Sequence, residues 1–317
     1  MVERGFETEP MKRQPALVIA SYATIYVVWG STYFFIRQSV LTIPPVWVMA
    51  VRWLIGGVLL TGFAAVRGSL RPLPSWRAVL SSVVLGALLL LFGNGLITVA
   101  ERNVDSYLAA LLASSTPILV ALIDSLLLRK PLTAARVLGV LFGFVGVALL
   151  LYNGHSLAAS LNPSVLIGLA GILSWALATS LGHRFPVSGD NTVNSGIQML
   201  FVGAVCLLGA FVTGPSPAAV FAHASTLAVI GVIYLGVLGS LAFSAYTYLV
   251  RVEPAERVVS YALVNPLIAM FLGLVLVSET PTPYLPVGVP LALVGLGFML
   301  YGERLVAWLR RRVRTPG

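Results

Sequence analysis

The sequence predicts an all-α polytopic membrane protein with ten transmembrane helices, arranged as two inverted five-helix repeats. Three observations carry this prediction: few charged residues, apolar blocks of membrane-spanning length, and a similarity between the two halves of the chain. Only 10% of the 317 residues are charged and 58% are hydrophobic, and the mean hydropathy is +0.95. A soluble domain usually carries about 25% charged residues. The composition therefore excludes a water-exposed surface of this size and indicates that lipid is the surrounding solvent.

The apolar residues form blocks of about 20, the length that a helix needs to cross about 30 Å of hydrocarbon. Short connections with Pro, Gly, Asn and charged residues separate these blocks and leave no room for a soluble domain. The ten predicted spans are residues 17–36, 45–66, 78–100, 106–127, 133–152, 164–183, 192–213, 225–249, 255–277 and 284–303.

The distribution of Lys and Arg predicts the orientation of these spans. All but three of the 20 Lys and Arg residues fall on the side of the bundle that carries both termini. Arg37 and Arg102 fall on the other side, and Arg52 falls within the second span. Because cytoplasmic loops are enriched in Lys and Arg, we expect a multi-pass membrane protein with cytoplasmic N and C termini.

The two halves of the chain resemble each other at a fixed offset of 149 residues. Residues 139–152 align with residues 288–301 without a gap, and Pro117 matches Pro266. Five spans per half is an odd number, so the second half enters the membrane from the opposite side. Inverted repeats are typical of carriers that bind their solute near the membrane midplane, between the two halves.

Three motifs resemble a known family. They read WGSTYFFIR at residues 29–37, GNGLITVAE at 93–101 and SYALVNP at 260–266. Together they resemble the EamA family of the drug/metabolite transporter superfamily, over almost the whole chain. The resemblance implies transport of small metabolites across the bacterial inner membrane, often the export of amino acids. One position departs from the pattern: Lys130 replaces the Glu that usually follows the fourth helix, whereas Glu279 is retained in the second half.

This division gives four expected segments along the chain. They are a cytoplasmic N-terminal tail (1–16), a first five-helix EamA repeat (17–152), a second five-helix EamA repeat (164–303) and a basic cytoplasmic C-terminal tail (304–317).

Polar groups in hydrocarbon are costly unless satisfied, so polar residues within the spans should face the bundle interior. Pro117 and Pro266 each lack the N–H that closes a helical turn, and we expect paired hinges there; prolines tolerated by neighbouring helices are the alternative.

Arg52 could hold a substrate carboxylate or snorkel to the membrane surface. Each aromatic residue could instead serve packing or the interfacial belt. The predicted substrate-binding residues are Trp29, Tyr33, Asn94, Ser115, Trp175, Ser244, Tyr246, Tyr261 and Asn265.

Hydroxyl, amide and aromatic groups without deep charges suit an apolar or aromatic solute that keeps a few hydrogen-bonding groups. We expect a carrier that exports amino acids, aromatic and other neutral ones, by alternating access around a central cavity between the repeats. The alternatives are an exporter of another metabolite or drug-like amphiphile, and a non-transporting receptor or scaffold. Glu101 and Asp124 fall near span ends, so no central proton relay is expected and the carrier is predicted to be facilitative.

An intramembrane enzyme would need a nucleophile with a base, or a metal motif such as H-E-x-x-H. Three scattered histidines and the single Cys206 supply neither, so no catalytic residue, metal or cofactor is expected. The expected partners are a small-molecule substrate and membrane lipids, with no nucleic acid, and the chain should be a monomer or a weak homo-oligomer. Gly139 and Gly143 permit close helix approach; packing within the bundle is expected, and a dimer face is the alternative.

Overall fold

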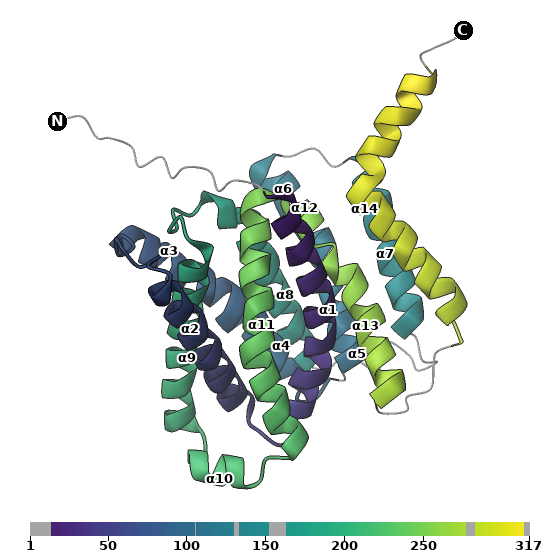
Figure 1. Ribbon diagram of the computed structural model, residues 1–317. Helices are drawn as coiled ribbons and strands as arrows, with labels where there is room; N and C mark the ends of the chain where they lie inside the picture. The colour runs from purple at the N-terminus through teal and green to yellow at the C-terminus, as the bar shows by residue number, and fades with distance from the viewer. Residues whose placement is uncertain (1–13, 105, 130–132, 152–162, 277–282, 314–317) are drawn as a thin grey trace, which may run out of the picture.

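The computed structural model describes residues 14–104, 106–129, 133–151, 163–276 and 283–313, and all regular secondary structure there is helical (Figure 1). The segments are α1 (Pro15–Val40), α2 (Pro45–Val66), α3 (Trp76–Gly86), η1 (Ala87–Asn94), α4 (Gly95–Ala100), α5 (Ser106–Ala113), α6 (Thr116–Leu128), α7 (Ala134–Leu151), α8 (Pro163–Leu181), η3 (Gly182–Arg184), α9 (Asn191–Thr213), α10 (Pro217–Ala222), α11 (Thr226–Val252), α12 (Ala255–Val258), α13 (Tyr261–Leu276) and α14 (Leu285–Val313).

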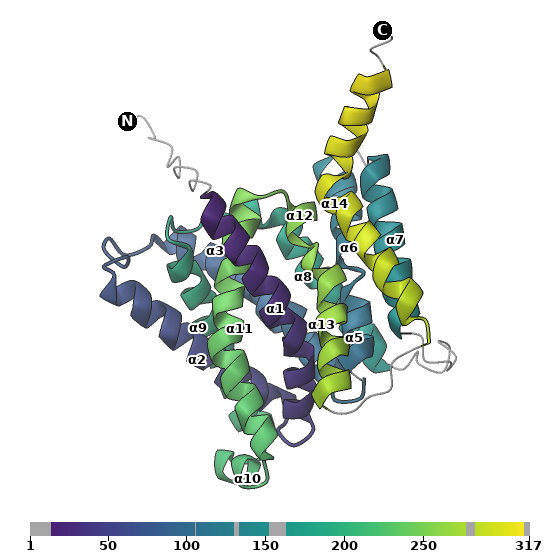
Figure 2. The same ribbon diagram turned by 45° about the vertical axis from the view of Figure 1, so that its right-hand side comes forward.

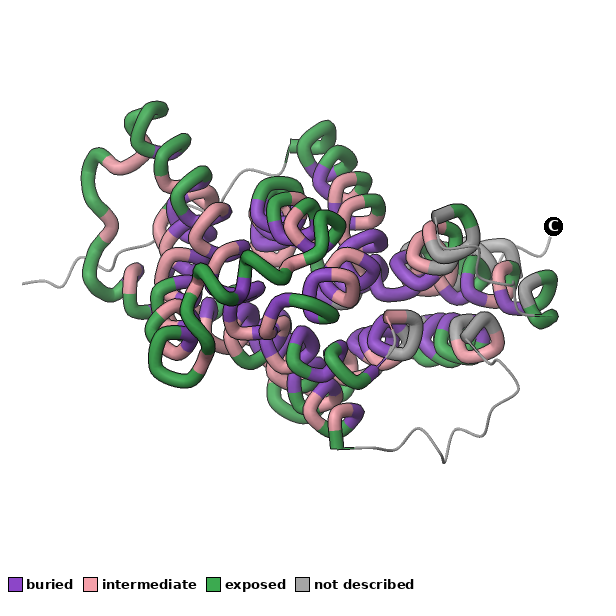
Figure 3. Tube along the Cα trace, turned by 90° about the horizontal axis from the view of Figure 1, so that it is seen from below, coloured by how far each residue is buried: buried purple, intermediate pink, exposed green. Residues whose placement is uncertain are grey.

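The helices form a polytopic membrane bundle, as predicted. Six helical segments of the described chain are long and apolar enough to cross a membrane: α1, α2, α3 through α4, α8 through η3, α9 and α11. Shorter apolar stretches lie in α6, α7 and α14. Exposed residues lie mostly on the outer faces of the bundle (Figure 3), and many of them are large and apolar, as lipid requires. The count of ten spans remains a prediction.

The helix pairs of the two halves correspond to each other. α2 packs along α9 and α7 packs along α14, and each of these pairs joins segments that the repeat relates. α1 packs on α11 and α13, while α8 packs on η1, α4 and α6. The repeat relates α11 to the segment from α3 through α4, and α13 to α5 and α6. The contacts of α1 with α11 and α13 therefore correspond to the contacts of α8 with η1, α4 and α6. α1 begins and α14 ends at the same end of the bundle, which we name the terminal end (Figure 1).

Glycines bring the backbones of α7 and α14 together, and the two helices lie side by side in both views (Figure 2). A Cβ added at Gly146 would lie 2.9 Å from the Ala292 Cα atom, and one at Gly295 would lie 2.5 Å from the Gly143 Cα atom. The Gly139–Gly143 segment therefore packs within the chain, which confirms the expected internal role.

The third predicted span is helical over its whole length but is not a uniform α-helix. Residues 87–94 form a π-helical segment between α3 and α4. A widened turn leaves backbone carbonyls without their usual partners. Here the Ser174 hydroxyl of α8 donates to the Leu88 carbonyl oxygen at 2.8 Å. The sequence prediction missed this segment because its composition is the same as that of an ordinary apolar helix.

The last helix continues beyond the predicted span. α14 runs to Val313 and projects past the rest of the bundle (Figure 1), so the basic tail expected from residue 304 begins as a continuation of this helix. Residues 303–313 contain Glu, Leu, Ala and Arg, which favour helices, and neither Gly nor Pro. The helix propensity of these residues explains why α14 continues past the apolar span.

Replacing Gly295 by Ala should destabilise the bundle by about 1–3 kcal/mol, because the added methyl group overlaps the backbone of α7. The matched control is Gly297→Ala on the same helix, since a Cβ there meets no atom within 4 Å. Thermal unfolding of the detergent-solubilised protein measures both. Equal melting temperatures for the two variants would contradict the close α7–α14 contact.

Candidate functional site

Helices from both halves of the chain enclose a cavity of about 590 Å³, its opening included. We name it the central cavity. Its wall combines aromatic rings, apolar side chains and polar groups. The lining residues are Trp29, Thr32, Tyr33, Ile36, Arg52, Trp53, Asn94, Ile97, Ala113, Thr116, Ile172, Trp175, Phe243, Tyr261 and Asn265.

Two helix interruptions shape this wall. α5 ends at Ala113 and α6 begins at Thr116, directly before Pro117. The Thr116 hydroxyl donates to the Ala113 carbonyl oxygen and the Ser115 hydroxyl donates to the Leu112 carbonyl oxygen, both at 2.6 Å. The Thr116 bond satisfies the Ala113 carbonyl, whose usual helical donor would be the N–H that Pro117 lacks. The Leu112 carbonyl oxygen also accepts from the Ser115 backbone N–H at 3.0 Å.

The corresponding region of the second half is built differently. α13 stays helical through Pro266, and the interruption lies earlier, at residues 259–260 between α12 and α13. This break places Tyr261 at the start of α13. Asn265, directly before the proline, is 2% exposed, and its Oδ1 atom has no hydrogen-bond partner.

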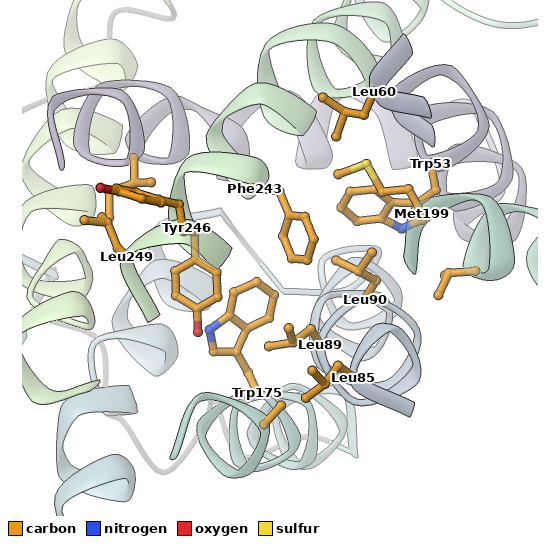
Figure 4. Packing of buried hydrophobic residues seen from close by; sticks show 14 of the residues in the cluster. Trp53, Leu60, Leu85, Leu89, Leu90, Trp175, Met199, Phe243, Tyr246 and Leu249 are labelled. Carbon is orange, nitrogen blue, oxygen red and sulfur yellow. The ribbon is translucent and has the colours of Figure 1, made fainter. Parts of the chain in front are cut away.

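Four aromatic residues pack together at one side of the central cavity: Trp29, Trp175, Tyr246 and Tyr261, which we name the aromatic layer. The Trp29 ring lies 5.4, 5.0 and 4.9 Å, between centroids, from Trp175, Tyr246 and Tyr261 respectively. The indole nitrogen of Trp175 points toward the Tyr246 hydroxyl (Figure 4). The Tyr246 hydroxyl is hydrogen-bonded to the Thr179 hydroxyl. Tilted and edge-on ring contacts of this kind stabilise a rigid layer.

The cationic group of the central cavity is Arg52, which is 3% exposed and does not snorkel to the surface. Its guanidinium carbon lies 4.1 Å from the centre of the Trp53 ring, a cation–π contact that suits a desolvated cation. The Nε and Nη1 atoms of Arg52 have no hydrogen-bond partner. Two strong donors thus remain available at the cavity wall.

Glu101 is an acidic residue that interacts with Arg52. It is fully buried at the end of α4, and neither carboxylate oxygen has a hydrogen-bond partner. It interacts electrostatically with Arg37 and Arg52, while the Arg37 guanidinium also donates to the Glu101 and Arg102 carbonyl oxygens. Buried charges need compensating charge nearby. The sequence placed Glu101 at the margin of a span, but the structure buries it completely.

A second cavity, of about 420 Å³ with its opening included, lies beyond the aromatic layer. It lies where α9 begins and α11 ends, toward the terminal end (Figure 1). We name it the amide cavity. Tyr246 lines the amide cavity, whereas the other three rings of the aromatic layer line the central cavity. The aromatic layer therefore separates the two cavities. Its lining residues are Leu85, Leu89, Ala178, Thr179, Gly182, Val187, Asn191, Asn194, Gln198, Tyr246, Thr247, Val250 and Arg251.

Most of the predicted site residues converge on these features. Ser115 and Ser244 do not line either cavity: Ser115 bonds its own helix, and Ser244 accepts from the Asn191 side chain. Lys130 and Glu279 fall outside the described residues. The predicted residues that line the central cavity are Trp29, Tyr33, Arg52, Asn94, Trp175, Tyr261 and Asn265.

Several lining residues were not predicted. Thr32 and Trp53 adjoin predicted residues in sequence, whereas Phe243 is one apolar residue among many. The sequence did contain a pattern from which the amides of the amide cavity could have been predicted. Asn191, Asn194 and Gln198 are spaced three and four residues apart, which places them on one face of an otherwise apolar helix.

A membrane-embedded helical bundle around a polar and aromatic cavity defines a polytopic membrane protein of the transporter class. The profile of the EamA-like transporter family matches residues 17–152 and 162–301. The chain therefore belongs to the EamA-like transporter family, as its motifs indicated. The family is one of transporters rather than enzymes.

Individual relatives agree with this assignment. The chain is 35% identical to the uncharacterized inner membrane transporter YedA of Escherichia coli K12, over 93% of this chain and 95% of YedA. It is 25% identical to the uncharacterized transporter YvbV of Bacillus subtilis, over 90% of this chain and 91% of YvbV. One solved crystal structure shares the fold, with a TM-score of 0.72 and 19% identity over 92% of this chain and 100% of that chain.

Replacing Tyr246 by Phe should lower the free energy of unfolding by about 0.5–1.5 kcal/mol, because it removes the buried hydrogen bond to Thr179 and keeps the ring contacts. Tyr301→Phe is the matched control, since Tyr301 is 60% exposed. Denaturant-induced unfolding in detergent compares the two. If the Tyr246→Phe variant were as stable as the Tyr301→Phe variant, the Tyr246 hydroxyl would not stabilise the aromatic layer.

Proposed function

We propose that this protein exports small metabolites across the membrane, and that its substrates are amino acids, with aromatic and other neutral ones favoured. The observation that carries the proposal is the central cavity, to which both halves contribute rings and polar groups without partners. Small-ligand pockets commonly combine apolar walls with a few placed polar groups. The central cavity matches that description.

The chemistry of the wall suits an amino acid. Arg52 offers Nε and Nη1 donors to a carboxylate, and Asn265 offers its Oδ1 acceptor to an ammonium group. Trp29 and Trp175 provide aromatic surface for an apolar side chain. A charge-assisted bond to Arg52 would satisfy groups that are otherwise buried without partners.

We further propose that ten spans form two inverted repeats with both termini in the cytoplasm. The corresponding contacts of α1 and α8 support a pseudo-twofold relation between the halves. The excess of Lys and Arg on the terminal side supports the orientation. The terminal end is then the cytoplasmic end of the bundle.

The two cavities support transport by alternating access. The central cavity and the amide cavity lie on opposite sides of the aromatic layer. A solute crosses only if the layer rearranges, and rocking of the two halves is a movement that achieves this. The breaks before Pro117 and before Tyr261 place interrupted helices beside the cavity, where such a movement can bend them.

Purified protein in liposomes should exchange labelled L-phenylalanine against unlabelled L-phenylalanine, which is counterflow. A carrier with a single shared site produces this exchange, whereas a receptor or scaffold does not. Protein-free liposomes are the control. Counterflow of other metabolites or amphiphiles without any amino acid would overturn the substrate assignment, and no counterflow with any solute in a broad panel would overturn the carrier mechanism.

Replacing Arg52 by Met should raise the KM for L-phenylalanine about 10–100-fold, since a hydrogen bond to a charged group is worth about 1.5–3 kcal/mol. The KM for phenethylamine, which lacks the carboxylate, should change little. Arg67→Met is the matched control: Arg67 also stacks on an aromatic ring of α2, but it is exposed. If both solutes lose affinity equally, Arg52 does not recognise the carboxylate.

A further inference from the structure

The amide cavity contains a constellation of polar groups that the central site does not use. Asn191, Asn194 and Gln198 line it from the first turns of α9, and Arg251 lines it from the last turn of α11. The apolar remainder of its wall comes from α3, η1, α8, α11 and Val187. A polar cluster of this kind within a membrane bundle points to a solute pathway.

One of the three amides has a structural role. The Asn194 Oδ1 atom accepts from the Ser188 N–H at 2.9 Å, and its Nδ2 atom donates to the Ser188 carbonyl oxygen at 2.8 Å. The Ser82 hydroxyl of α3 also donates to Oδ1 at 3.4 Å. Asn194 thus fixes the connection before α9, and all of its bonds stay within the protein.

The amides on either side of Asn194 keep acceptors without partners. The Asn191 Nδ2 atom donates to the Ser244 carbonyl oxygen at 2.7 Å and to the Thr247 hydroxyl at 3.0 Å. These bonds fix the orientation of the amide, and its Oδ1 atom remains buried without a partner. Gln198 is 2% exposed, and its Oε1 atom is also buried without a partner.

Arg251 adds a cationic group to the same cavity. One of its guanidinium N–H groups donates to the Ser188 carbonyl oxygen at 3.0 Å, which leaves further donors. Asp190, the N-cap of α9, interacts electrostatically with Arg251. Partial burial raises the pKa of Asp190, but hydrogen bonds from Ser69 and from the Thr192 and Val193 N–H groups outweigh it and hold the pKa below its ordinary value.

We propose that the amide cavity is a second binding site for the zwitterionic head of the transported solute, in which Gln198 and Asn191 accept hydrogen bonds from the ammonium group and Arg251 donates to the carboxylate. This inference rests on the proposed function and deepens it. An ammonium group carries three donors and no acceptor. It therefore satisfies two buried acceptor oxygens at once, which a purely apolar or anionic solute cannot do.

The two sites act at different faces of the carrier. The aromatic layer separates them, so a solute in the amide cavity contacts Tyr246 and not the Arg52 side of the central cavity. The amide cavity therefore binds solute that arrives from the terminal end, before the layer opens. Its residues set the affinity at that face alone.

Right-side-out and inside-out membrane vesicles from the same cells present opposite faces of the protein, and a tag on the C terminus identifies the face that carries the termini. In this assay Gln198→Met should raise the KM for L-phenylalanine about tenfold at the terminal face. The KM at the far face should stay within about twofold. At the terminal face the KM for 3-phenylpropionate, which lacks the ammonium group, should not change.

Gln198→Glu provides an independent test in the opposite direction. A carboxylate accepts stronger hydrogen bonds from an ammonium group than an amide does, so this variant should lower the KM for L-phenylalanine at the terminal face. Ser240→Ala is the matched control: Ser240 is 1% exposed and its hydroxyl has no partner, but it lies outside both cavities.

The outcomes separate this inference from the proposed function. Wild-type vesicles without any solute exchange would mean that the proposed function fails. Exchange by the wild type, together with a KM that Gln198→Met raises equally at both faces or at neither, would overturn the second site and leave the carrier intact. If Gln198→Met raised the KM for 3-phenylpropionate as much as the KM for L-phenylalanine, the second site would also be overturned, because the ammonium group would then play no part in binding.

Discussion

The structure depends on one constraint: hydrocarbon offers no hydrogen bonds, so polar groups of the spans must find partners inside the bundle. The breaks and widened turns show how this is met. Thr116 and Ser115 satisfy carbonyls at the α5–α6 break, and Ser174 reaches across to the π-helical segment. Arg52 and Gln198 have polar atoms without a protein partner, and each of these two residues lines a cavity.

The correspondence between the halves explains why the cavities lie where they do. α2 with α9 and α7 with α14 form close, glycine-mediated helix contacts between the halves, while α1 and α8 bring Trp29 and Trp175 together at the aromatic layer. The halves are nevertheless not identical at the site. α5 breaks directly before Pro117, whereas α13 continues through Pro266, so the two walls present different groups to the solute.

Much of the fold was predictable because membrane thickness fixes the length of apolar blocks. The second span was expected at 45–66 and α2 runs from Pro45 to Val66. The site was less predictable, since depth and side-chain direction decide it. Glu101 lies near the end of a span in sequence, yet the fold buries it beside two arginines. The amide spacing on α9 was readable, but only the packing of α9 against α11 shows that these amides share a cavity.

The central claim is that one pathway crosses the membrane through two cavities on opposite sides of the aromatic layer. Cysteine accessibility tests it most directly, in a Cys206→Ala background that removes the one native thiol. A membrane-impermeant thiol reagent should label Thr32→Cys from the far face and Val250→Cys from the face that carries the termini, and L-phenylalanine should protect both positions. Labelling of both positions from the same face would contradict the account.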